Sequence, residues 1–277
     1  TVFVCSQTDL FLRHYSDDWI DQVFAVMALC PQHTFIVLTK RTGRMLHYIE
    51  RTDDKGRHPA MEYAALIAMT GRYTTPALDL RQWPLPNVWL GTSVEDQETA
   101  NDRIPALINT TATVRFISAE PLLGQVDLTK IQIGDFSGLN SLNGTYWNDL
   151  TEMKGTIPAI DWVICGGESG RNARPMHPDW ARSLRDQCKA AGVPFFFKQW
   201  GAWAPQIGAI DLYEFGDKSR RCWAAWDDQS EKWEYWDKPS WCDDIGPVED
   251  CVVRVGKKAA GRLLDGRTWD EFPEALR

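Results

Sequence analysis

The sequence predicts an α/β protein built on a parallel (β/α) barrel of the TIM type, incomplete at its N-terminus. Short apolar runs, typical of strands buried on both faces, recur along the first 200 residues. Each run is followed by a polar turn, and most turns lead into a helical pattern. Strands that alternate with helices imply right-handed crossovers, and therefore a parallel sheet.

Six apolar runs predict six strands. They are residues 2–5, 34–38, 87–90, 114–117, 161–165 and 194–197. Six such units, with at least one more expected upstream, favour a closed or partly closed barrel over an open doubly wound sheet. In either arrangement the chemistry is expected beyond the carboxyl ends of the strands.

Two of the intervening helices have clear boundaries in the sequence. Residues 17–29 carry an apolar stripe at helical spacing, with Ser16 or Asp17 as N-cap. Residues 179–191 place apolar side chains four residues apart and are followed by Gly192, a signal for a helix C-terminus. Both segments fit the crossovers that a parallel sheet requires.

Two stretches depart from the βα rhythm. Residues 135–155 are rich in Gly, Asn, Ser and Thr and are expected to form an inserted loop or flap in a barrel core of residues 1–200. Residues 201–277 are expected to form an antiparallel hairpin region and a C-terminal helix packed on the barrel. This region contains Trp203, Trp223, Trp226, Trp233, Trp236 and Trp241. An aromatic mini-core is the favoured interpretation of these tryptophans, and base stacking is the alternative.

Composition and charge exclude several classes of protein. A formal net charge of -8 argues against broad attraction to phosphate backbones, although a local basic patch stays possible. No long apolar segment or signal peptide occurs, so no membrane partner is expected and the cytoplasm is the expected compartment. Seven scattered cysteines are expected to be reduced, buried thiols. The strand-like pattern that starts at Thr1 suggests that residues are missing upstream.

Charged side chains follow the predicted strands. Glu95, Glu120 and Glu168 each come shortly after a strand, and Lys40 and Lys198 follow two others. A barrel makes such strand ends converge, so Lys40, Glu95, Glu120 and Lys198 are the candidate catalytic residues. Pairing between these acids and bases would instead be structural.

The turn Gly166-Gly167-Glu168-Ser169 predicts a close approach between backbone and ligand. Adjacent glycines permit positive φ and expose N–H and C=O groups, while the carboxylate can accept hydrogen bonds from an ammonium group or ribose hydroxyls. A tight turn with an ordinary surface glutamate is the alternative. Motifs for P-loops, dinucleotide binding, helical zinc sites and serine hydrolases do not occur.

Four consecutive segments carry distinctive motifs, NVWLGTSVE at 87–95, RFISAEPLLG at 115–124, DWVICGGESG at 161–170 and PFFFKQWG at 194–201. Together they resemble a phage and prophage protein family of undefined function that is grouped with radical S-adenosylmethionine (SAM) enzymes, and RVGKKAAGRLLDG at 254–266 resembles that family's C-terminus. The resemblance covers nearly the whole chain, and it implies a barrel enzyme.

The resemblance also implies cofactors and a substrate class. Members of the family begin with a cysteine trio thought to hold a [4Fe-4S] cluster, and this chain lacks such a trio. The chain is therefore expected to be either an N-terminally shortened member or a divergent one, inactive in radical chemistry as it stands. The expected SAM-binding residues are Ser118, Gly166, Gly167, Glu168 and Ser169. In radical SAM barrels a Gly-Gly-Glu turn commonly contacts the SAM amino group near an early strand, whereas here the turn is late. The expected substrate is a nucleic acid or nucleoside.

Two other functions stay open from the sequence. A non-catalytic module could engage nucleic acid or a phage partner through its Trp-rich region. A metal-dependent acid-base barrel enzyme could use Glu95, Glu120 and Glu168.

Overall fold

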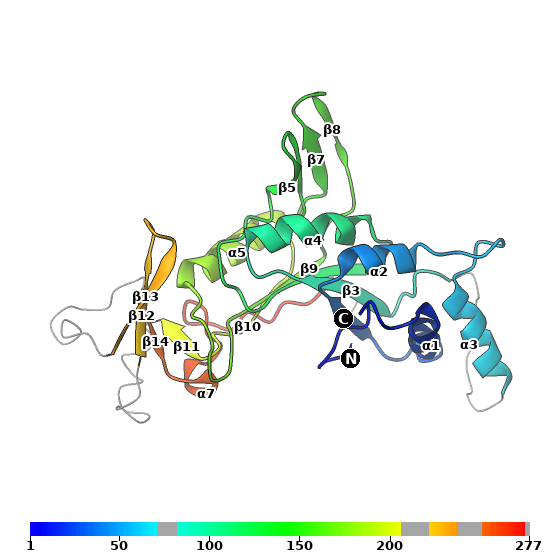
Figure 1. Cartoon of the computed structure of the whole chain (residues 1–277), viewed down its shortest axis with the longest axis horizontal. Coiled ribbons are helices and arrows are strands. Elements are labelled where there is room, and N and C mark those ends of the chain that lie inside the picture. Colours follow the sequence, from blue (N-terminus) through cyan, green and yellow to red (C-terminus); the bar gives the residue numbers. More distant parts are fainter. Residues whose placement is uncertain (71–81, 206–221, 238–250, 275–277) are drawn as a thin grey trace. The chain divides into compact units, whose positions relative to one another are not determined.

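The computed structural model describes residues 1–70, 82–205, 222–237 and 251–274. Six parallel strands form one sheet in the order β1-β2-β3-β4-β9-β10 (Figure 1). They are β1 (Val2–Val4), β2 (Phe35–Thr39), β3 (Val88–Ser93), β4 (Val114–Ala119), β9 (Trp162–Gly166) and β10 (Phe195–Gln199). Each strand coincides with one predicted apolar run, so the parallel α/β class is confirmed. The described strands do not complete a barrel.

Helices follow most of these strands. They are α1 (Asp17–Ala28), α2 (Thr42–Ile49), α3 (Pro59–Met69), α4 (Gln97–Asn109), α5 (Pro178–Ala191) and the single turn α7 (Lys257–Ala260). The hydroxyl of Ser16 accepts from the backbone N–H of Trp19 at 3.4 Å, so Ser16 is the N-cap of α1. Helix α5 ends at Gly192 in the left-handed conformation, as the sequence predicts.

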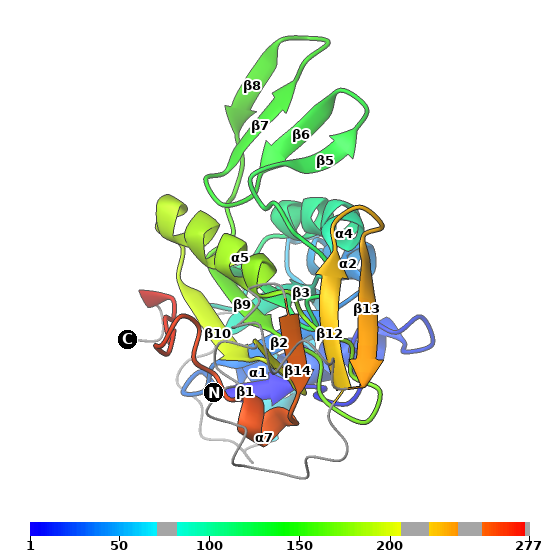
Figure 2. The ribbon, with the colours of Figure 1, turned by 90° about the vertical axis from the view of Figure 1, so that its left-hand side faces the viewer.

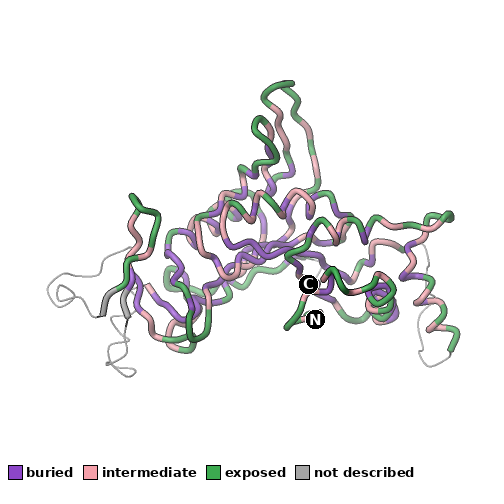
Figure 3. The backbone as a smooth tube through the Cα atoms, viewed as in Figure 1, coloured by how far each residue is buried: buried purple, intermediate pink, exposed green. Residues whose placement is uncertain are grey.

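The described chain divides into two compact units. The first comprises Thr1–Ser93, Asn101–Ser118 and Thr129–Trp162, and the second comprises Val94–Ala100, Ala119–Leu128 and Val163–Arg277. In the first unit all six residues of β3 are buried (Figure 3). The rings of Trp89 and Phe116 pack on Trp162 at centroid distances of 6.0 and 5.9 Å. These large apolar rings form the core of the first unit.

A buried polar network joins the helices of the first unit. The hydroxyl of Tyr48 donates to the carboxylate of Asp21 at 2.8 Å, and Nε2 of His58 lies 2.9 Å from the carbonyl oxygen of Tyr48. Nδ1 of His58 accepts from the N–H of Ala60 and caps the start of α3. The His58 ring also stacks on Trp83 at 3.7 Å. The network is satisfied internally, which is what burial of polar groups requires.

The predicted insertion is ordered into strands. Strands β5 (Ile131–Gly134), β6 (Ser137–Asn140), β7 (Thr145–Asn148) and β8 (Met153–Thr156) form a four-stranded antiparallel sheet (Figure 2). A loop or flap was expected because residues 135–155 are rich in Gly, Asn, Ser and Thr. Asn143 and Gly144, with φ of 67° at Gly144, supply a turn between β6 and β7, and the ring of Trp147 lies against Gly138. Turn residues between short β-forming runs therefore build hairpins here.

The Trp-rich region forms a second antiparallel sheet in the order β11-β14-β12-β13 (Figure 2). Its strands are β11 (Trp203–Pro205), β12 (Cys222–Asp227), β13 (Lys232–Asp237) and β14 (Cys251–Arg254). This arrangement confirms the predicted antiparallel region. Trp203 is 4% exposed and donates from Nε1 to the carbonyl oxygen of Ala173 at 2.8 Å, so it belongs to an aromatic mini-core. Trp241 and Cys242 lie outside the described residues.

Among the helices that the structure describes, none is both long and apolar enough to cross a membrane. The predicted burial of thiols is confirmed for Cys165, Cys188 and Cys251, whereas Cys5 and Cys30 are partly exposed. Desolvation raises the pKa of the Cys188 thiol to about 12 and also raises that of Cys165.

Candidate functional site

Glu120 is the centre of a polar cluster in the second unit. It follows Ala119, the last residue of β4. Its Oε2 accepts from Nζ of Lys198 at 2.8 Å, and its Oε1 accepts from Nε2 of Gln199 at 3.0 Å. The same amide nitrogen lies 3.2 Å from Oγ of Ser169. Side chains from the end of β10 and from the turns after β4 and β9 therefore meet at one carboxylate.

An irregularity in β10 brings two consecutive side chains to Glu120. Phe197 pairs with Cys165 and Gln199 pairs with Gly166, so Lys198 and Gln199 together oppose a single residue of β9. Successive side chains of a regular strand point to opposite faces, and a bulge of this kind breaks the alternation. The extra residue allows both an ammonium and an amide to bind the same carboxylate.

Neighbouring protein atoms leave little room for a side chain at either glycine of the predicted ligand turn. A Cβ on Gly166 would lie 3.2 Å from Oε1 of Glu120. A Cβ on Gly167 would collide with the carbonyl oxygen of Trp200, while the N–H of Gly167 donates to the carbonyl oxygen of Gln199 at 2.9 Å. The close approach that adjacent glycines predicted is therefore an approach to β10 and the residues after it.

Glu168 is held by Arg174. Oε2 of Glu168 accepts from the backbone N–H of Arg174 at 2.8 Å and from its Nε at 2.9 Å, and Oε1 accepts from Nη2 at 3.0 Å. These hydrogen bonds lower the pKa of the Glu168 carboxyl. The carboxylate thus already has a cationic partner, which is the structural alternative weighed for this residue. Its contact with SAM stays a prediction.

Glu95 belongs to the same unit through its backbone. Its carbonyl oxygen accepts from the N–H groups of Leu123 at 2.7 Å and Gly124 at 3.2 Å, which follow Glu120 in the chain. The residue is 8% exposed. Its negative charge helps to raise the pKa of Arg174, after the larger effect of Glu168. Glu95 is therefore placed near the end of the turn that carries Glu120.

Lys40 and Ser118 lie in the first unit. The backbone N–H of Lys40 donates to Asp9 at 3.0 Å, and the same carboxylate accepts from Oγ1 of Thr39 at 2.8 Å and from Nη1 of Arg41 at 2.9 Å. Ser118 is buried near the end of β4, opposite Ser93. The structure thus brings Glu120, Ser169 and Lys198 together beside Gly166. The roles of Lys40 and Ser118 stay predictions.

Gln199 and Arg174 are the site residues that the sequence did not single out. Gln199 lies in the segment PFFFKQWG directly after Lys198, but it has no charge and so was not chosen as a candidate. It is 8% exposed, and its Oε1 has no hydrogen-bond donor among the residues that the structure describes. Arg174 lies six residues beyond Glu168 in a segment without periodicity, so no spacing pattern links the two.

An iron-sulfur cluster does not fit the described residues. A [4Fe-4S] cluster is held by cysteine thiolates. Five free cysteines have side chains that the structure describes, and the described residues contain no group of three or more His, Cys, Asp or Glu that could hold a metal. Glu120 and Lys198 are paired at 2.8 Å, which is the structural alternative stated above for these acids and bases. Because the Lys198 side chain is 51% exposed, the pair also presents an anion and a cation at the surface. Such a pair can recognise a zwitterion.

Comparison with known proteins gives a family and no relative with a described role. Neither a curated protein nor a solved structure matches the chain. A model of a family described as a protein of unknown function, DUF5131, matches residues 1–273, and the chain therefore belongs to the DUF5131 family.

Proposed function

We propose that this protein is a SAM-binding enzyme of the radical SAM type, with a TIM-like barrel fold and a nucleic acid or nucleoside as substrate. The observation that carries the proposal is the meeting of Glu120, Lys198, Gln199 and Ser169 at the carboxyl ends of three parallel strands. Parallel α/β enzymes place their ligands at this end of the sheet. The four motifs that resemble a family grouped with radical SAM enzymes support the choice of cofactor.

The ion pair suits the amino acid part of SAM. The methionyl group carries an ammonium and a carboxylate on one carbon atom. Glu120 would accept from the ammonium, and Lys198 would pair with the carboxylate. The Lys198 side chain is 51% exposed and that of Glu120 is 19% exposed, so both can reach a ligand. A charge-assisted contact of this kind contributes about 1.5–3 kcal/mol to binding.

The proposal assigns SAM binding, and not cluster binding, to the described residues. The residues of this chain would hold the methionyl group beside the carboxyl ends of the strands. Gly166 would leave room for the Glu120 carboxylate, because a Cβ there would press against it.

Calorimetric titration with SAM tests the binding step. We expect Lys198→Gln to weaken SAM binding by about tenfold or more, because it removes one charge-assisted contact. Lys189→Gln, an exposed lysine at the end of α5, is the matched control and should bind SAM like the parent protein. Circular dichroism would verify that both variants are folded. If the parent chain does not bind millimolar SAM, the proposal fails.

A separate measurement tests the radical step. The protein, reconstituted without oxygen with iron, sulfide and a reductant, should form 5′-deoxyadenosine from SAM. Binding of SAM without any 5′-deoxyadenosine would reject the radical assignment and keep the SAM site.

A further inference from the structure

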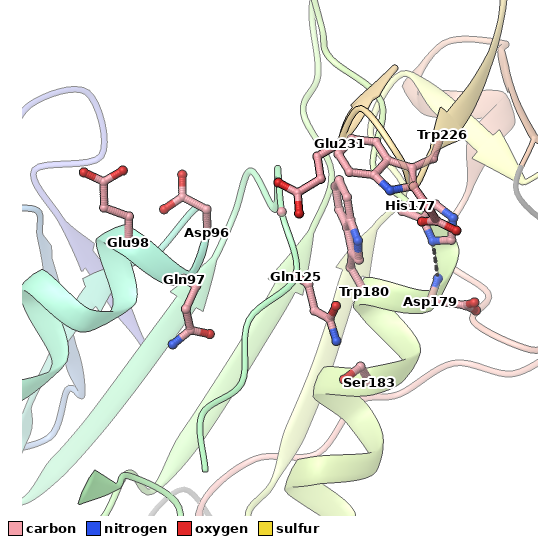
Figure 4. A pocket seen from close by; sticks show the side chains of 12 residues that line it. Asp96, Gln97, Glu98, Gln125, His177, Asp179, Trp180, Ser183, Trp226 and Glu231 are labelled. Atoms are coloured by element: carbon pink, nitrogen blue, oxygen red, sulfur yellow. Dashed lines mark hydrogen bonds between the residues drawn. The ribbon is translucent and has the colours of Figure 1, made fainter. Parts of the chain in front are cut away.

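A second cavity in the second unit is lined by carboxylates. Its volume is about 960 Å³, and it lies among the segment before α4, the turn after Glu120, the start of α5 and the β12–β13 hairpin (Figure 4). This volume suits a ligand larger than one side chain. The carboxylates that line it are Asp96, Glu98, Asp179, Asp228 and Glu231, and none of the described Lys or Arg residues lines it.

Part of this acidity has a structural cause. Asp96 accepts from the N–H of Thr99 at 2.8 Å in the first turn of α4, and Asp179 pairs with Arg182 at 2.7 Å in α5. Carboxylates are favoured at these helix N-termini. Glu98 also lies in the first turn of α4. Asp228 and Glu231 are exposed in the hairpin and have no such cause. The hairpin thus contributes negative charge that is not explained by the preference for carboxylates at helix N-termini.

Aromatic rings form another wall of the same cavity. Trp180 and Trp226 meet edge to face at a centroid distance of 4.9 Å, and His177 lies 5.6 Å from Trp180. Figure 4 shows Trp180 between Glu231 and Gln125. Indole rings attract ammonium and guanidinium groups through their faces. The carboxylates and rings therefore favour the same kind of ligand.

Trp180 also supplies a hydrogen-bond donor at this wall. The residue is 6% exposed and lines the cavity. Its Nε1 is not one of the described side-chain atoms that are closed off from solvent without a partner, so the indole N–H is open to the cavity and can donate to a ligand. A metal ion would satisfy neither the rings nor this donor, and the described residues offer no metal-ligand group here.

We propose that this cavity binds an organic cation, an ammonium or guanidinium group on a carrier that also presents a carbonyl oxygen. The carboxylates attract the charge, Trp180 and Trp226 contact the cation, and the indole N–H of Trp180 donates to the carbonyl. A lysine or arginine side chain on a peptide has both features. A free polyamine has only the first. The site is independent of SAM binding at Glu120.

Binding of small probes tests the proposal. Acetyl-Gly-Lys-Gly-amide should bind, measured by calorimetry and by quenching of tryptophan fluorescence. The peptide with norleucine in place of lysine, which lacks the charge, should bind about tenfold more weakly or not at all. Spermidine is titrated in parallel, to distinguish a peptide from a polyamine. If the norleucine peptide binds as well as the lysine peptide, the proposal is overturned.

Variants locate the binding to this cavity. Glu231→Gln should weaken the lysine peptide about threefold at low salt and less at high salt, because an exposed charge is screened. Glu234→Gln, on the same hairpin but outside the cavity, is the control and should not change binding. Trp180→Phe should weaken the peptide about fivefold, the value of one hydrogen bond, and weaken spermidine less, because phenylalanine keeps an aromatic face for the cation. Equal effects of Glu231→Gln and Glu234→Gln would overturn the assignment.

Discussion

At the scale of single residues, the geometry around Glu120 explains why small residues follow β9. Gly166 and Gly167 were predicted to permit close approach to a ligand, and the structure shows that they permit close approach of β10. That reason could not be predicted from the sequence, because it depends on Trp200, which is more than thirty positions away. The presence of the turn could be predicted, since paired glycines have few other uses.

Two glycine substitutions distinguish the effect of side-chain packing on the free energy of unfolding from the effect of backbone entropy. Gly167→Ala should lower the free energy of unfolding by at least about 2 kcal/mol, because the new Cβ would meet the carbonyl oxygen of Trp200. Gly43→Ala, in α2 with no atom within 4 Å of the added Cβ, should raise it by about 0.5–1 kcal/mol. Urea denaturation measures both changes. Equal destabilisation by the two variants would contradict this account.

At the scale of elements, the strands were the most predictable part and the connections the least. Every parallel strand was visible because burial on both faces demands an unbroken apolar run. The strands of the β5–β8 insertion were not predicted, because the many Gly, Asn, Ser and Thr residues make short alternating runs such as Thr145–Asn148 hard to recognise. The cavity beside α5 was not predicted either, because in the sequence Trp180 is one position of an apolar helix stripe. The cavity forms because the β12–β13 hairpin lies opposite this residue, and no sequence pattern shows that contact.

The cap of α3 should make this helix sensitive to acid. Burial lowers the pKa of His58 to about 4, from an ordinary value of 6.5. The neutral ring caps α3 through Nδ1, so protonation costs the fold. Stability is complete above pH 6.5 and decreases as the pH falls toward 4, by up to about 3 kcal/mol.

Urea denaturation between pH 7 and pH 4.5 checks this dependence. His58→Gln should lose less stability over this range than the parent protein, because the titrating group is gone. His47→Gln, an exposed histidine in α2, should follow the parent protein. Parallel curves for all three proteins would show that His58 is not responsible.

At the scale of the whole molecule, burial decides which thiols can react. Cys165, Cys188 and Cys251 are buried, and desolvation keeps the first two protonated at neutral pH. We expect iodoacetamide to modify Cys30 and, more slowly, Cys5 in the native protein, because burial and then the charge of Asp9 raise the pKa of the Cys5 thiol, and to leave these three unmodified until unfolding. Peptide mass spectrometry measures the modification at each site. Rapid native labelling of Cys165 would contradict the packing of β9.

The distribution of charge over the second unit also bears on its substrate. A net charge of -8 and a cavity lined by five carboxylates repel phosphate groups. If a nucleic acid is the substrate, its backbone would therefore have to avoid this cavity and approach Lys198. Salt dependence of substrate binding, with and without Lys198→Gln, would reveal that route.

The extra residue in β10 makes the spacing of this strand as important as its chemistry. Deleting one position between Phe197 and Trp200 would leave a single side chain facing Gly166, and the carboxylate of Glu120 would lose either its cation or its amide. A shortened strand could thus keep every kind of side chain that the site needs and still fail to assemble it.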